Sequence, residues 1–395
     1  MTNLSSVQFD FISSVSSIRE DAWSRLTEDV SPFLEYGFLS ALEETGCVGQ
    51  EAGWVPHILC AHVEDDGEER LVGALPIYLK THSAGEFVFD HSWADAAFRA
   101  GISYYPKAVV AVPFTPITGH KLLYDPDFSE SEALKGAMVD RATQFVREEG
   151  LSSVHFNFFE PEERPYFEDF TLPIRYGMQY HWYNGADLGE GEDYEDFAEF
   201  LARFRSKKRS NIKRERRKLD EAGVNVQVLT GDDVTEAHLD RMFDYYQDTI
   251  QKFYWGRQYL NREFFHAAKD AFGDRIHMVV AEKDGREYAG AFNLMKDGSL
   301  YGRYWGCLDE VKYTHFEVCL YKAVEWCIEH GFQKFEPGAQ GDHKYDRGFQ
   351  PTHTFSAHYI REPRLRLAVE DFIRRESRQI DRRIEDMRES SPYKW

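Results

Sequence analysis

One glycine-rich stretch gathers acidic, basic and imidazole side chains within twelve residues. It reads "FEPGAQGDHKYDRGFQP", residues 335–351, and contains Glu336, Gln340, His343, Lys344 and Arg347. Acyl transfer to an amine needs a base for the nucleophile, a polarised carbonyl and a proton for the leaving group. Glu336 or His343 could be the catalytic base, and the other three could hold a carboxylate, a phosphate or the oxyanion. The alternative is a polar surface loop with a structural salt bridge.

An arginine stands in a segment that otherwise reads as an apolar, central strand. In "LYGRYWG", residues 300–306, strand alternation places Tyr301, Arg303 and Trp305 on one face. A buried guanidinium requires an anionic partner. That partner is either a ligand or Glu336 on the neighbouring strand, so Arg303 is a candidate substrate-binding residue.

A second candidate cluster lies in the first half of the chain. The stretch "FDHSWADAAFRAGISYYPKAVVAVPF", residues 89–114, is rich in aromatic and ionisable residues. Aromatic rings beside charged groups can line an amphipathic cleft, or they can pack as a domain interface. On the first interpretation Asp90, His91, Trp93 and Tyr105 bind substrate.

The strongest charge feature is a basic stretch that contains "RSKKRSNIKRERRKL", residues 205–219. Ten of the sixteen residues from 203 to 218 are Lys or Arg, although the whole chain carries a formal charge of −21. A helix C-terminus favours one or two cations, but ten like charges repel each other. We therefore interpret the stretch as the docking surface for a phosphate-bearing donor, with a solvated helix face that balances the acidic body as the alternative. The predicted cofactor-binding residues are Lys207, Lys208, Arg209, Lys213 and Arg214.

The remaining composition narrows the class of protein. An acidic surface argues against general coating of DNA or RNA. His353 and His358 are five residues apart, which on a strand puts them on opposite faces, and no Cys or Asp cluster completes a metal site with His343. The five cysteines include no CxxC pair, which is typical of a reduced protein. Because a signal peptide and long apolar runs are also missing, we expect no metal, no DNA, no membrane span and a cytoplasmic location.

Two parts of the chain repeat one order of elements, which is strand hairpin, helix and strand. Residues 54–80 and 275–306 read as hairpins with Asp-Gly at the turns, and helices ending at Gly150 and Gly331 follow. This order predicts an α+β protein with two similar cores. We place the N-terminal domain at residues 1–180 and the C-terminal domain at residues 181–395.

Three further expectations concern helices of the C-terminal domain. A single basic helix begins near Phe197 and ends at Gly223. Thr314 and Glu317 match a capping box at the start of another helix. A long charged helix from about residue 364 to 388 closes the chain.

Several stretches of the sequence, taken together, match the pattern of a known protein family. The stretches "VFDHSWADA", "YYPKAVVAVPFTPITG", "HWYN", "RSKKRSNIKRERRKL", "LYGRYWG" and "FEPGAQGDHKYDRGFQP" together resemble a bacterial FemAB-like family of the GNAT (acyl-CoA N-acyltransferase) superfamily. A more distant likeness is to the Fem peptidoglycan aminoacyltransferases, which carry two GNAT-type domains and use aminoacyl-tRNA. Their basic helix and Gly-rich turn are similar to residues 208–226 and 338–349. The usual GNAT pyrophosphate loop is missing before the helix that opens near residue 314.

The resemblance implies tandem GNAT-like domains and an acyltransferase activity. The expected reaction moves an acyl group from acyl-CoA or aminoacyl-tRNA to the amine of a small molecule or peptide. A peptidoglycan-related precursor is one expected acceptor, and tRNA is a partner only under the second donor. The alternative is a non-catalytic protein that uses a degenerate GNAT cleft to recognise a peptide or cell-wall precursor.

Overall fold

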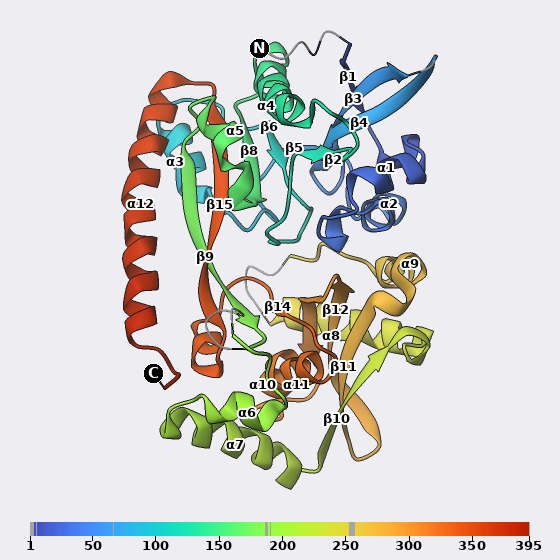
Figure 1. Cartoon of the computed structure of the whole chain (residues 1–395), viewed down its shortest axis with the longest axis vertical. Helices are drawn as coiled ribbons and strands as arrows, with labels where there is room; N and C mark the ends of the chain where they lie inside the picture. Colours follow the sequence, from blue (N-terminus) through green and yellow to red (C-terminus); the bar gives the residue numbers. More distant parts are fainter. Residues whose placement is uncertain are drawn as a thin grey trace. The chain divides into compact units, whose positions relative to one another are not determined.

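The chain forms two compact units that share its C-terminal part. The computed structural model describes residues 4, 6–65, 67–185, 189, 191–252 and 257–394, so that Asp66 of the first expected turn lies outside the described residues. The first unit contains residues 1–177 and 353–382, and the second contains 178–352 and 383–395. Residues 353–382 thus belong to the first unit and not to the C-terminal domain that the sequence pattern predicts. They return because β15 (Gln350–Ile360) pairs antiparallel with β8 (Ser153–Phe159), as Figure 1 shows.

The first unit contains two sets of paired strands. One set has the order β1 (Gln8–Ile12), β3 (Ile58–Asp65), β4 (Glu68–Leu75) and β7 (Leu123–Tyr124). The other runs β15, β8, β6 (Lys107–Val110), β5 (Ile77–Lys80) and β2 (Trp54–Pro56). Among these, β6 and β8 are parallel, and the other adjacent pairs are antiparallel. The expected hairpin over 54–80 is therefore divided between two sheets.

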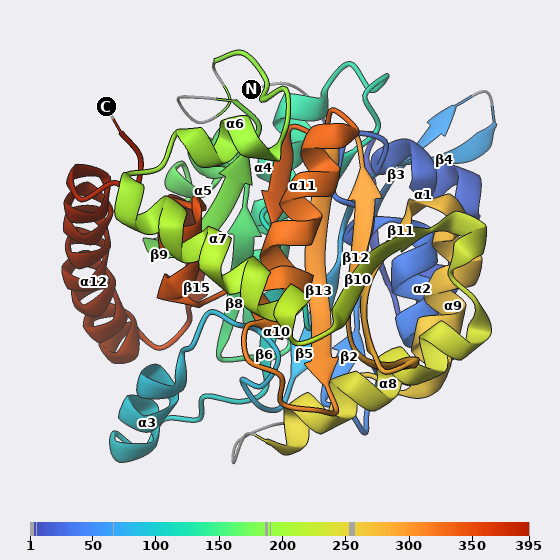
Figure 2. The ribbon, with the colours of Figure 1, turned by 90° about the horizontal axis from the view of Figure 1, so that it is seen from below.

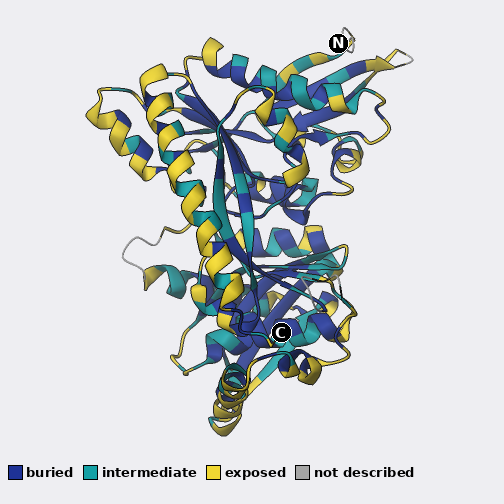
Figure 3. Ribbon diagram, turned by 60° about the vertical axis from the view of Figure 1, so that its left-hand side comes forward, coloured by how far each residue is buried: buried dark blue, intermediate teal, exposed yellow. Residues whose placement is uncertain are grey.

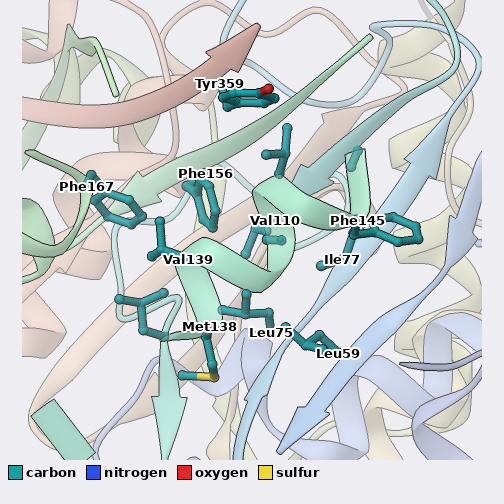
Figure 4. Packing of buried hydrophobic residues seen from close by; sticks show 14 of the residues in the cluster. Leu59, Leu75, Ile77, Val110, Met138, Val139, Phe145, Phe156, Phe167 and Tyr359 are labelled. Carbon is teal, nitrogen blue, oxygen red and sulfur yellow. The ribbon is translucent and has the colours of Figure 1, made fainter. Parts of the chain in front are cut away.

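Helix α4 (Ser131–Glu148) supplies the centre of the first unit's core. Its residues Met138, Val139 and Phe145 pack with strand residues such as Leu59 and Phe156, as Figure 4 shows. Burial of this apolar stripe stabilises the helix on the strands by about 25 cal/mol per Å² of apolar surface. The other helices of this unit are α1 (Glu20–Leu26), α2 (Tyr36–Glu44), α3 (His91–Arg99) and α5 (Arg164–Glu168), and α12 (Pro363–Glu389) begins here and ends in the second unit.

The second unit is built on a meander of antiparallel strands. These are β10 (Val224–Thr230), β11 (Ile276–Lys283), β12 (Arg286–Lys296) and β13 (Ser299–Cys307). Strand β14 (Lys334–Glu336) adds parallel to β13, and β9 (Ile174–Tyr183), which begins in the first unit, pairs antiparallel with β14. The parallel step requires a crossover, which α10 (Thr314–Phe316), a π-helical turn (Glu317–Tyr321) and α11 (Lys322–Glu329) provide.

Helices cover both faces of the second unit's sheet. Residues Leu219 of α7 (Ser206–Glu221) and Val318 of the π-helical turn pack on the face that carries Val279. Figure 2 shows α7 and α11 in front of the strands. The opposite face holds Tyr304, which contacts α8 (Glu236–Gln251) and α9 (Arg262–Phe272) through Tyr246 and Phe265. In Figure 3 the strands are mostly buried and the outward faces of the helices are exposed.

Two glycines let helix α8 approach the sheet closely. Gly290 and Gly306 are cross-strand partners on β12 and β13. A Cβ on Gly306 would lie 1.9 Å from the Tyr245 carbonyl oxygen, and one on Gly290 would lie 3.1 Å from the Tyr245 ring. Any side chain at residue 306 would therefore force the helix off the sheet.

Two local expectations are wrong, and in both cases tertiary contacts explain the difference. The basic helix is divided into α6 (Phe197–Ala202) and α7, because Phe204 forms an antiparallel bridge with Tyr393 near the chain's end. The capping box does not form, since the Thr314 hydroxyl is hydrogen-bonded to Tyr288 at 2.7 Å and Glu317 pairs with Arg216.

Three global features concern the described residues alone. Among them, no helix is long and apolar enough to cross a bilayer. In the same residues all five cysteines are free thiols, and no group of three or more His, Cys, Asp or Glu side chains could hold a metal ion.

Candidate functional site

The glycine-rich stretch folds into a compact turn at the end of β14. After Glu336 the chain enters a 3-10 helix, η8 (Asp342–Arg347), and then β15. Gly341 and Gly348 flank η8 with φ angles of 96° and 94°, a region in which other residues are strained. A Cβ on Gly341 would also lie 2.7 Å from the His343 ring. Glycine at 341 is what allows the loop to fold back on itself.

Lys344 holds a buried ammonium group inside this turn. Its Nζ donates to the carbonyl oxygens of Pro337 at 3.1 Å and Gly338 at 2.8 Å. Burial, together with a smaller effect of the Arg303 charge, lowers the pKa of Lys344 to about 8. An ammonium has three donors, and these two carbonyls are its only acceptors among the described residues. The third N–H is thus available for a ligand.

Arg303 stands at an irregularity in β13. Its neighbours Gly302 and Tyr304 pair with Asn293 and Phe292, which are adjacent on β12, so Arg303 is the extra residue of a β-bulge. Bulges re-aim a side chain and occur often next to active sites. Burial lowers the pKa of the Arg303 guanidinium, and the nearby Tyr304 and Glu336 partly oppose that effect. The expected proximity of Arg303 to Glu336 is therefore present.

Glu336 is a buried carboxylate with a positive neighbour on its own strand. Its Oε1 lies 2.5 Å from Lys334 Nζ, and its Oε2 lies 3.6 Å from His181 Nε2. Burial lowers the pKa of His181 to about 4, so this imidazole is neutral near pH 7. The contact with Lys334 makes Glu336 a counter-charge, which is a role different from that of a free base.

His343 is the better placed of the two candidate bases. Its ring contacts those of His315 and Phe316 at centroid distances of 5.3 and 5.5 Å. Burial lowers the pKa of His343, and the charges of Arg347 and Lys344 add to the effect. Its Nε2 is buried and has no hydrogen-bond partner within the described part of the chain. A neutral imidazole with an unengaged nitrogen can accept a proton.

Arg347 and Gln340 depart from their expected roles. The Arg347 Nη2 lies 2.9 Å from both carboxylate oxygens of Glu215 on α7, and its guanidinium lies 3.4 Å from the Phe316 ring. The structural salt bridge that the sequence left as an alternative is therefore present at Arg347. Gln340 is exposed and has a φ of 65°, so it points to solvent and does not join the buried groups.

The basic residues of α7 divide into engaged and unengaged cations. Lys208 forms an ion pair with Asp346 of η8, which brings the helix against the candidate site. Lys207, Lys213 and Arg214 are exposed, and Arg209 is half-buried; no acidic partner of these four lies among the described residues. These four cations of α7 are therefore not neutralised by a carboxylate within the described part of the chain.

The first-half cluster forms a separate buried network in the first unit. Asp90 and Trp93 are almost fully buried, whereas Tyr105 is half-buried and bonds through its hydroxyl to Ser83 at 2.7 Å. His91 is exposed on α3 and does not join them. Three of the four expected residues thus lie in one region.

Arg303, Glu336, His343 and Lys344 form one electrostatic neighbourhood in the second unit. Glu336 acts on the pKa of Arg303, Arg303 on that of Lys344, and Lys344 on that of His343. The sequence interpretation missed three residues that touch this group, which are Lys334, His181 and His315. Lys334 could have been found, because it stands two positions before Glu336 on one strand and so shares its face.

One comparison with known proteins gives a family that covers nearly the whole chain. A family model described as FemAB-like, for peptidoglycan biosynthesis or recognition, matches residues 14–395. No curated protein sequence matches the chain.

The comparison with solved structures gives information about the fold. FemX is similar with 11% sequence identity and a TM-score of 0.52, over 91% of this chain and 100% of its own. L-PGS from Bacillus licheniformis has 11% identity and a TM-score of 0.48, over 86% of this chain and 95% of its own. A tandem GNAT protein from the clavulanic acid biosynthesis pathway has 10% identity and a TM-score of 0.44, over 90% and 99%. The likeness to FemX confirms the predicted α+β class with tandem GNAT-like domains.

Proposed function

Because this chain belongs to the FemAB-like family, we propose that it is an acyltransferase that moves an acyl or aminoacyl group to an amine. The observation that carries the proposal is the buried Lys344 ammonium, which has an unengaged donor beside Arg303. Two positive groups in a low-dielectric turn stabilise the negative oxygen that develops when an amine attacks an acyl carbonyl. If Lys344 had only a structural role, burying it beside a carboxylate would cost less free energy than burying it beside carbonyl oxygens alone.

In this reaction one proton moves from the attacking amine to the leaving group. The amine nitrogen bonds to the acyl carbon, and the thioester bond of acyl-CoA or the ester bond of aminoacyl-tRNA breaks. His343 takes the proton that the amine loses and passes it to the leaving sulfur or oxygen. Glu336 balances the charges of Lys334 and Arg303 and keeps them in place.

The donor is either acyl-CoA or aminoacyl-tRNA, and we favour the second. Four cations of the one helix α7 have no acidic partner among the described residues, and these are Lys207, Arg209, Lys213 and Arg214. A polyanion such as tRNA uses such a surface more fully. The family description makes a peptidoglycan precursor the preferred amine acceptor.

A non-catalytic recognition role is the second candidate function. The helix that follows β13 opens at Tyr313, which has a φ of 77° and no side-chain cap, and the Gly-rich sequence that usually cradles the CoA pyrophosphate is missing there. The family description also includes recognition.

One experiment separates these candidates. Purified protein is incubated with a muropeptide precursor and either acetyl-CoA or a charged tRNA mixture, and products are measured by mass spectrometry. Transfer by the wild type that is lost in Lys344→Met supports catalysis at this site. Lys269→Met is the matched control, because Lys269 is a half-buried lysine of the same unit that donates to the Gly231 carbonyl. Precursor binding without turnover with any donor would support recognition alone.

A further inference from the structure

A groove in the first unit is not used by the proposed reaction. Its volume is about 680 Å³, and pockets for small ligands usually measure about 300–1,000 Å³. One wall is a face of α12, and the other is formed by α5, residues 171–173 and the start of β9. Leu172, Ile174 and Ile373 give the groove apolar surface. The groove therefore has the size and the mixed lining of a small-molecule site.

Direct contacts hold the two walls together. Tyr176 N on β9 donates to Ser377 Oγ on α12 at 3.3 Å, and Arg175 lies 2.6 Å from Glu376. Figure 1 shows α12 alongside β9. Thr171, which lines the groove, has a φ of 53°, which is an outlier for a β-branched residue and is the kind of strain found at ligand sites. Because the walls are fixed before any ligand binds, the entropy cost of binding is low.

The charged residues that line the groove have formal charges that sum to zero. They are Arg164, Arg374, Arg378, Glu168, Glu370 and Asp381. Arg164 Nε lies 2.6 Å from Glu168, and Arg164 Nη1 donates to the Tyr176 hydroxyl at 3.0 Å. Asp381 is hydrogen-bonded to His353 at 2.9 Å. Three of these charged groups therefore already have partners.

The other three charged groups lie on one face of α12 and have no partner. Arg374 and Arg378 are exposed, and Glu370 is half-buried. Their charged atoms make no ion pair and no hydrogen bond with any described residue, whereas the adjacent Arg375 pairs with Asp371 at 2.9 Å. Like charges four residues apart destabilise a helix, so an anion bound between Arg374 and Arg378 would remove that cost.

We propose that the groove binds a short zwitterionic peptide, with its carboxylate between Arg374 and Arg378 and its ammonium group at Glu370. Guanidinium groups hold a carboxylate through paired N–H···O bonds. At 1.5 Å per residue, Glu370 lies roughly 9 Å along the helix axis from the midpoint of the two arginines. An extended chain covers that distance in about three residues, since each spans roughly 3.3 Å.

The balance of charges favours this ligand over other anions. A phosphate or a nucleic acid brings excess negative charge, which Glu370 would repel. A zwitterion satisfies both signs, and its side chains can cover the apolar surface of Leu172, Ile174 and Ile373. The groove shares no residue with the candidate site of the second unit, so the inference does not rest on the proposed acyl transfer.

A series of blocked peptides tests the proposal on the full-length wild-type protein without any acyl donor. Calorimetry compares trialanine that has free termini with trialanine amide, N-acetyl-trialanine and inorganic phosphate at equal ionic strength. We expect saturable binding of trialanine and at least about tenfold weaker binding of either blocked form, because each loses one charged contact. No saturable binding of trialanine, or equal binding of the three peptides, would overturn the proposal. Tighter binding of phosphate than of trialanine would also overturn it, and would make the two arginines a simple anion site.

Two double variants locate the binding. Arg374→Gln/Arg378→Gln should weaken trialanine binding at least about tenfold and remove the preference for trialanine over its amide. Arg375→Gln/Arg382→Gln is the matched control, because it removes the same charge from exposed residues of α12 that do not line the groove. Equal binding by the wild type and both variants would place the peptide elsewhere and refute the assignment. If circular dichroism shows that the first variant is unfolded, the peptide series on the wild type still decides.

Discussion

Arg347 and Glu215 are 132 residues apart in the chain, yet Arg347 Nη2 lies 2.9 Å from both carboxylate oxygens of Glu215. Tyr321 donates to the same carboxylate at 2.5 Å. Because Glu215 is on α7 and Arg347 ends η8, the pair fastens the basic helix to the candidate catalytic turn. The helix that carries the proposed docking surface is therefore joined directly to the turn that carries the proposed catalytic groups.

The first prediction concerns the stability of this contact. Glu215→Gln leaves the buried Arg347 charge without its partner, so the free energy of unfolding should fall by about 3–5 kcal/mol in urea titrations. Glu221→Gln is the control, because Glu221 pairs with exposed Lys218 on the same helix and its loss should leave the free energy of unfolding nearly unchanged. Similar losses in the two variants would mean that the Arg347 pair is solvated.

The second prediction is the pH dependence of acyl transfer. The pKa of Lys344 is lowered to about 8, so the ammonium loses its proton, and its power to stabilise the oxyanion, as pH rises through that value. The rate should therefore decline above about pH 8. On the acid side, the lowered pKa of His343 extends the neutral form of this base to lower pH than an ordinary histidine would allow. A measured kcat/KM that is still rising at pH 9 would exclude Lys344 as an ammonium catalyst.

The third prediction distinguishes the two donors by salt. Binding of tRNA to the α7 surface should weaken steeply with salt, since the slope of log K against log salt is roughly −0.7 per phosphate contact for a single-stranded nucleic acid. The double variant Lys213→Ala/Arg214→Ala should reduce the slope by the amount that corresponds to about one or two lost phosphate contacts. The double variant Lys283→Ala/Lys312→Ala removes the same charge from the same unit and should leave the slope unchanged. Fluorescence anisotropy with labelled tRNA measures both. A CoA ligand that binds with a shallow slope while tRNA does not bind would favour acyl-CoA.

The fourth prediction is a loss of stability in acid. His155 and His358 are cross-strand partners with their Nδ1 atoms 2.8 Å apart, and burial lowers the pKa of His155 to about 3. An unfolded histidine titrates near 6.5, so below that pH the unfolded chain binds protons that the folded chain refuses. This contribution to stability is complete above about pH 6.5 and declines as pH falls toward 3.

Variants of the same pair isolate its share of the acid response. Urea unfolding at pH 7.0, 5.5 and 4.5 should show a smaller pH dependence in His155→Gln/His358→Gln than in the wild type. His91→Gln provides the control, since His91 is exposed on α3. If the double variant keeps the full pH dependence, other groups govern the acid response.

Local residue patterns predicted the parts of the molecule that local contacts determine. Asp-Gly turns indicated the hairpin of β11 and β12, and the residue types of 336–347 indicated the polar turn. The residue types of Lys344 and His343 indicate acid–base chemistry, and in the structure Lys344 acts on the pKa of His343 and is itself affected by Arg303.

Partners that lie far apart in the chain could not be predicted in this way. Arg347 looks like a ligand-binding residue until Glu215 is seen beside it, and no periodicity connects residues 132 positions apart. The division of the basic helix depends on Tyr393 in the same manner.

The return of residues 353–382 to the first unit has a consequence for biosynthesis. Strand β15 completes the pairing of β8, and its residues leave the ribosome about two hundred residues after those of β8. During that interval β8, with seven buried residues, has one edge without its native neighbour. Exposed strand edges of this kind are where chains associate wrongly. The first unit therefore cannot complete its strand pairing until about half of the chain's length has been made after β8, and a chaperone that shields this edge in the interval should raise the yield of native protein.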